Sequence, residues 1–119
     1  MTAKSSRPVR AISIRQPYVE LILRGVKRYE FRSRPTNIRE RVYLYAAQQP
    51  ADSRQQWRKA RARPGSLRTG AILGTVEIVG CRWDERRDCY AYRLVKPRRL
   101  KRVMHPRNPP SPVFWRPKF

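Results

Sequence analysis

The sequence has little cysteine and still less histidine: Cys81, Cys89 and His105 are all that its 119 residues contain. Two cysteines do not make a disulfide framework. No CxxC pair occurs and the histidine lies far along a basic stretch, so the spacing of a zinc site is absent too. We therefore expect free thiols in a reducing cytoplasm, no metal and no cofactor, and little scope for acid–base catalysis by histidine.

Long hydrophobic runs are also missing. No apolar segment approaches the roughly 18 residues of a membrane span, and none follows the N-terminus as in a secretory signal. We expect neither a membrane protein nor a secreted one, and no membrane partner. The hydrophobic content of 39% is nevertheless too high for a disordered chain. A length of 119 residues suits one domain with its own core.

Acidic residues are also few. Eight Asp and Glu stand against 29 Lys and Arg, which gives a formal net charge of +21 at pH 7. A domain this basic repels itself unless an anionic partner compensates, and phosphate backbones are the commonest such partner. The charge predicts a nucleic-acid-binding protein, compatible with a place in a nucleoprotein assembly. The alternative is a chain whose charge serves only solubility.

What the sequence does contain is a series of short strand patterns. Residues 1–10 are basic without periodicity and predict a flexible arm ahead of a domain at residues 11–119. Alternating or β-branched residues predict strands at 11–14, 27–32, 42–47, 70–83, 89–95 and 113–115. Within the longest of these, Gly74 and Gly80 predict a bulge or bend of the kind that closes a barrel.

Two helix patterns interrupt the strands. The first begins at Pro17, ends at Gly25, and carries one apolar stripe that consists of Val19, Ile22, Leu23 and Val26. The second runs from a cap at Asp52 or Ser53 to about Arg63, with Trp57 as its docking anchor. Several strands with two short helices predict an α+β, mainly β fold: a small mixed β-barrel.

Positive charge is concentrated in two stretches that contain no acid. The predicted contacts to a nucleic-acid backbone are Arg54, Arg58, Lys59 and Arg61 in the second helix pattern, and Arg98, Arg99, Lys101 and Arg102 near the C-terminus. On a helix the three arginines of the first group share one face, which can lie along a phosphate backbone. For any single residue, a solvated charge remains the simpler reading.

The tyrosines and tryptophans are interleaved with this charge. They are Tyr18, Tyr29, Tyr43, Tyr45, Trp57, Trp83, Tyr90, Tyr92 and Trp115. Such rings stack on bases in proteins that bind single strands. In a small barrel most of them are expected to belong to the core, with a minority left for a ligand.

One acid stands apart from those in turns. Glu30 lies within an aromatic strand pattern with Lys27 and Arg32 close in sequence, so three ionisable groups can meet at one strand end. In a concave site they could bind a base edge or perform acid–base chemistry. The alternative is an internal network of ion pairs that orders the barrel, and local spacing alone favours it.

Longer motifs favour a binding site at Glu30 over an internal network of ion pairs. Ile12-Ser-Ile-Arg-Gln-Pro17, followed by a helix and by the pattern Gly25-x-Lys-x-x-Glu-x-Arg32, resembles the ASCH (activating signal cointegrator homology) family. The later Leu73–Glu77, Tyr90–Leu94 and Pro112–Trp115 segments are similar to that family as well. The resemblance covers about residues 11–116.

The resemblance implies a PUA-like β-barrel with a cleft beside the first helix that binds RNA or another nucleic acid. Carried over residue by residue, the motif assigns to that cleft Gln16, Pro17, Gly25, Lys27, Glu30 and Arg32, with Trp115 closing it. We therefore predict non-covalent binding of nucleic acid, RNA in preference to DNA.

A second function follows from similar small proteins that are acetylcytidine amidohydrolases. Their motif has threonine where this chain has Glu30, whereas Lys27 and Arg32 are retained. A charged carboxylate is not activated as a hydroxyl is. The alternative to a binding protein is thus a nucleoside- or RNA-processing enzyme, amidohydrolase-like or a ribonuclease, with Lys27 and Glu30 as its acid–base pair.

Overall fold

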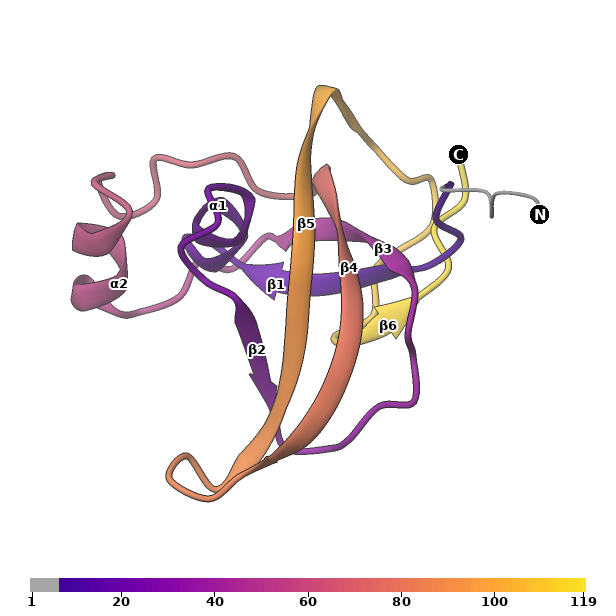
Figure 1. The fold of residues 1–119 in the computed structure, drawn as a ribbon. Coiled ribbons are helices and arrows are strands. Elements are labelled where there is room, and N and C mark those ends of the chain that lie inside the picture. Colours follow the sequence, from indigo (N-terminus) through magenta and orange to yellow (C-terminus); the bar gives the residue numbers. More distant parts are fainter. Residues whose placement is uncertain (1–6) are drawn as a thin grey trace.

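The computed structural model describes residues 7–119. In this range a six-stranded sheet has the order β2-β5-β4-β3-β1-β6. Its strands are β1 (Ala11–Arg15), β2 (Tyr29–Arg32), β3 (Arg41–Ala47), β4 (Ala71–Asp84), β5 (Cys89–Met104) and β6 (Phe114–Trp115). Strands β1 and β3 are parallel, and the other neighbours are antiparallel. The sheet curls into a half-barrel, with β2 and β6 at its edges (Figure 1). The expected α+β, mainly β fold is confirmed.

Helix α1 (Tyr18–Leu23) packs against the sheet through Val19 and Ile22. It ends before Gly25, whose φ of +78° lies in the left-handed region that favours glycine. The predicted apolar stripe was wrong at its end. Val26 lies beyond the helix and is 49% exposed, whereas Leu21, outside the predicted stripe, is buried.

Helix α2 (Arg54–Lys59) begins after Ser53, whose Oγ accepts a hydrogen bond from the backbone N–H of Gln56 at 3.4 Å. Trp57 is buried, as predicted for an anchor, and its Nε1 donates to the carbonyl of Ala51 at 2.9 Å. The predicted extension to about Arg63 was wrong. The helix stops because Arg61 adopts a positive φ of 54°.

Strand β5 was predicted to end at Val95 but continues to Met104. The register passes from Val95 to Arg98 across a single residue of β4, so Lys96 and Pro97 form a bulge. A bulge tolerates proline because no ladder N–H is needed there. The C-terminal basic residues therefore lie on a strand.

Strand β4 is irregular at both of its glycines, as predicted. A Cβ built on Gly74 would lie 2.6 Å from the carbonyl oxygen of Arg98 and 2.5 Å from Cδ2 of Leu23. Glycine thus allows β5 and α1 to approach β4 closely, which brings α1 onto the curled sheet.

The predicted N-terminal arm falls largely outside the described residues, since residues 1–6 are not among them. At its end Arg10 is held to the domain: its Nε donates to Glu40 at 2.8 Å and its carbonyl accepts from the N–H of Tyr43. Neither helix within residues 7–119 is long and apolar enough to cross a membrane.

Candidate functional site

Strand β2 places a carboxylate inside the half-barrel. Side chains alternate along a strand, and Glu30 turns inward, where it is 7% exposed. Its Oε1 lies 3.5 Å from Nζ of Lys27, and its Oε2 accepts a hydrogen bond from Nε of Arg32 at 2.8 Å. The carboxylate of Glu30 therefore contacts both of the basic residues that lie near it in the sequence.

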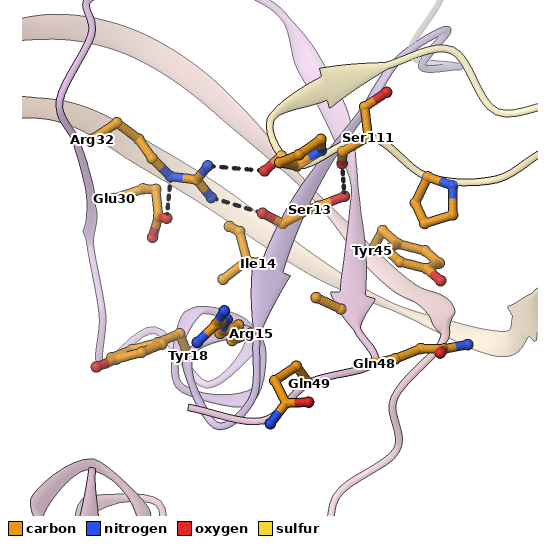
Figure 2. A pocket seen from close by; sticks show the side chains of 13 residues that line it. Ser13, Ile14, Arg15, Tyr18, Glu30, Arg32, Tyr45, Gln48, Gln49 and Ser111 are labelled. Carbon is orange, nitrogen blue, oxygen red and sulfur yellow. Dashed lines mark hydrogen bonds and ion pairs between the residues drawn. The ribbon is translucent and has the colours of Figure 1, made fainter. Parts of the chain in front are cut away.

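Arg32 joins this carboxylate to two other segments (Figure 2). Its Nη2 donates to the carbonyl of Ser13 on β1 at 2.7 Å, and its Nη1 donates to the carbonyl of Pro112 at 3.2 Å. Ser13 in turn donates from Oγ to the carbonyl of Ser111 at 2.6 Å. The C-terminal segment is thereby fixed against β1 and β2.

A cavity of about 630 Å³ opens beside these contacts. Its size lies within the range of small-ligand pockets, about 300–1,000 Å³. It is lined by Ser13, Ile14, Arg15, Tyr18, Glu30, Arg32, Tyr45, Ala47, Gln48, Gln49, Pro110, Ser111 and Pro112 (Figure 2). The lining combines one carboxylate and two guanidinium groups with two tyrosine rings.

Lys27 lies at the edge of this site. Its Nζ is 5.1 Å from the ring centroid of Tyr18 and 4.9 Å from that of Phe31, besides its contact with Glu30. Burial lowers the pKa of Lys27, the charge of Glu30 opposes this, and Arg32 and Arg87 lower it further. Lys27 does not line the 630 Å³ cavity but lines a neighbouring hollow, as Gly25 does.

Three other residues assigned to the cleft by the motif lie behind its walls. Gln16 is fully buried: its Nε2 donates to the carbonyl of Arg68 at 3.0 Å, and its Oε1 accepts from the N–H of Glu20. Pro17 is fully buried at the start of α1. Trp115 is 8% exposed and donates from Nε1 to Oγ of Ser13 at 2.9 Å. None of the three lines the cavity.

The cations of the α2 region form an exposed group, which we call the α2 patch: Arg54, Arg58, Lys59 and Arg61. Within residues 7–119 no acidic side chain forms an ion pair with any of these four. Two of them, Arg58 and Lys59, lie in the last turn of the helix, where the macrodipole favours cations.

The basic residues of β5 divide into two kinds. Arg98, Lys101 and Arg102 are exposed and, in the described part of the chain, have no acidic partner. Arg99 instead donates to both oxygens of Glu20, at 3.0 and 2.9 Å. Arg99 therefore joins β5 to α1 and is also exposed at the surface.

Glu20 is the important residue that the sequence analysis missed. It is 8% exposed on α1 and also accepts from Nε of Arg24 at 2.8 Å, while Nη1 of Arg24 donates to the carbonyl of Ala60 beyond α2. Burial raises the pKa of Glu20, but hydrogen bonds from Arg99 and Arg24 outweigh it and hold the pKa below its ordinary value. The signal available in the sequence was an acid between two apolar residues, Val19 and Leu21, within a predicted helix.

These features make up a small, mainly β domain: a curled mixed sheet, a cavity beside buried ion pairs, and surface cations that have no acidic partner among residues 7–119. The model of the ASCH domain matches residues 12–101. The protein therefore belongs to the ASCH domain family, a PUA-like family thought to bind RNA. A comparison with curated proteins found no significant match. Within residues 7–119 no cluster of three His, Cys, Asp or Glu side chains is placed to hold a metal ion.

Proposed function

We propose that the protein binds single-stranded RNA without altering it, accepting one base in the cavity and holding the phosphate backbone on its basic surface. The observation that carries this proposal is the position of Glu30. It puts a 7% exposed carboxylate at a cavity of about 630 Å³ in a chain of net charge +21. A carboxylate repels phosphate but accepts hydrogen bonds from the amino or imino groups of a base.

The cavity lining suits a base in two further respects. The rings of Tyr18 and Tyr45 are at its wall, and flat aromatic groups stack on bases with little sequence preference. Arg32 and Lys27 hold the carboxylate in place through their ion pairs. Gln16 and Trp115 contribute by positioning the elements that surround the cavity.

The backbone contacts of this proposal are the α2 patch together with Arg98, Lys101 and Arg102. Unpaired surface cations attract phosphate because binding releases condensed counterions. Arg99 contributes charge from its fixed position beside Glu20. We place the protein in the cytoplasm, alone or within a nucleoprotein assembly, since its two free thiols accord with a reducing compartment.

The test compares Glu30→Gln with Glu40→Gln. Both remove one negative charge from an arginine-paired glutamate, but Glu40 does not line the cavity. We expect Glu30→Gln to weaken binding of single-stranded RNA about tenfold, as for the loss of one base contact, and Glu40→Gln to bind like the wild type, both by fluorescence anisotropy. Equal affinities of the two variants would contradict base recognition in the cavity.

One observation favours a second function. The lowered pKa of Lys27 and its 3.5 Å contact with Glu30 are the arrangement of an acid–base pair in a nucleoside- or RNA-processing enzyme. Acetylated cytidine and short RNAs, incubated with the wild type and with Glu30→Gln, distinguish the two functions. We expect both substrates to survive. Turnover that is lost in Glu30→Gln would make the protein an enzyme.

A further inference from the structure

The face of β2 opposite Glu30 carries its own set of aromatic and basic groups. Alternation turns Tyr29 and Phe31 away from the cavity. Residues paired across antiparallel strands share a face, so Tyr29 lies beside Arg93 of β5, and Phe31 beside Ala91. The same pairing continues into β4, where Ala91 faces Arg82 and Arg93 faces Gly80.

These residues surround a groove, which we call the outer groove: Tyr29, Phe31, Gly80, Arg82, Ala91 and Arg93. Two hollows of about 530 and 340 Å³ make it up and share Tyr29, Arg82 and Ala91. Its floor is low because Ala91 and Gly80 have almost no side chain. The groove therefore runs across the outside of β2, β5 and β4, which lie side by side (Figure 1).

Tyr29 is the ring of β2 that is free to receive a ligand in the outer groove. Phe31 is covered, since the guanidinium carbon of Arg87 lies 4.3 Å from its ring centroid and Nζ of Lys27 lies 4.9 Å away. Tyr29 is 37% exposed, and its ring is inclined by 22° to that of Phe31 at a centroid distance of 6.4 Å. Tyr29 thus extends an aromatic surface whose outer end is open.

The charge around this ring favours an anionic partner. Arg82 and Arg93 are diagonal neighbours on one face, and in the described part of the chain neither has an acidic partner. Two acids lie near one end of the groove. Asp84 is engaged by Nη1 of Arg87 at 3.0 Å, and Glu85 is exposed. A phosphate therefore fits between the two free arginines rather than at the acidic end.

We infer that the outer groove is a second nucleotide-binding surface for the single-stranded RNA whose base enters the cavity, an inference that rests on the proposed function. A base stacks on Tyr29 and the adjoining phosphate lies between Arg82 and Arg93. Strand β2 is the edge of the sheet, so an RNA strand can pass round it from the inner face to the outer one. Lys27 lies on that path, in contact with both Glu30 and Phe31.

The test uses two groove variants, Tyr29→Ala and the double change Arg82→Ser with Arg93→Ser. Phe119→Ala is the aromatic control, because Phe119 is 47% exposed and lies outside the groove. Arg107→Ser with Arg116→Ser removes the same charge from the exposed C-terminal segment. The probes are a single-stranded RNA of about ten nucleotides, followed by anisotropy, and each nucleoside 5′-monophosphate, followed by NMR.

We expect Tyr29→Ala to weaken binding of the oligomer at least about fivefold, the lower end for loss of one stacked base. The double arginine variant loses affinity for the oligomer more than its control, and in both groove variants the mononucleotides still shift the NMR signals of residues that line the cavity as they do in the wild type. Groove variants that retain full affinity for an oligomer whose binding depends on Glu30 would overturn this inference alone. A wild-type protein that binds no RNA would overturn the proposed function with it.

Discussion

At the residue scale, the ammonium group of Lys27 depends on a balance of opposing surroundings. Burial lowers its pKa, whereas the carboxylate of Glu30 raises it. We predict that Lys27 titrates below the ordinary lysine value of about 10.4, followed by NMR of its Cε and Nζ signals. Glu30→Gln removes the opposing charge and moves the pKa lower still, and Glu40→Gln leaves it in place. A Lys27 pKa at or above the ordinary value, or one that rises in Glu30→Gln, would contradict this balance.

Only some contacts of the site could be predicted from the sequence. The contact of Lys27, Glu30 and Arg32 follows from local spacing on one strand and its entry, so it could be predicted. Gln16 and Trp115 were expected at a ligand, but their partners are the carbonyl of Arg68 and the hydroxyl of Ser13, far away in sequence. A motif identifies such residues as a set without separating those that line a cavity from those that support it.

At the element scale, Glu20 attaches α1 to β5 and, through Arg24, to the end of α2. Its pKa is held below the ordinary value in the folded protein, so its stabilising effect is present above the unfolded pKa and is lost as pH falls through the folded one. We predict that Glu20→Gln lowers the free energy of unfolding at pH 7 by about 1–3 kcal/mol, the worth of hydrogen bonds to a charged group.

Urea denaturation as a function of pH tests the Glu20 prediction. The difference between the wild type and Glu20→Gln should shrink as pH falls below about 4, where an unperturbed glutamate is protonated. Glu85→Gln, which changes an exposed acid in the β4–β5 turn, should unfold like the wild type. A Glu20→Gln difference that is constant between pH 7 and pH 3 would show that the carboxylate charge is not what holds α1.

The elements themselves were predictable where the pattern is local. Alternation located the strands, and the caps located both helices. The prediction ended β5 at Val95 because Lys96-Pro97 is typical of a strand end. Only its pairing with β4, which absorbs both residues as a bulge, carries the strand on to Met104. Such pairing is a long-range property that a single stretch of sequence does not reveal.

At the scale of the whole molecule, four of the eight acids form ion pairs within residues 7–119. Glu20, Glu30, Glu40 and Asp84 each pair with an arginine. Exposed cations without an acidic partner among residues 7–119 include the α2 patch and Arg98, Lys101 and Arg102 of β5. Composition was enough to predict an anionic partner. The cavity is formed by segments that meet only in the curled sheet, so composition could not predict it.

The dependence of RNA affinity on salt measures how much of the binding comes from contacts to the phosphate backbone. If backbone neutralisation dominates, the logarithm of the association constant falls linearly with the logarithm of salt concentration, by about 0.7 per phosphate contacted on a single strand. For the variant in which Arg54, Arg58 and Arg61 are all serine, we predict weaker binding to every sequence and a slope shallower by about 2. An RNA affinity that does not change with salt, or a slope that the triple variant leaves unchanged, would show that the basic surface does not hold the phosphate backbone.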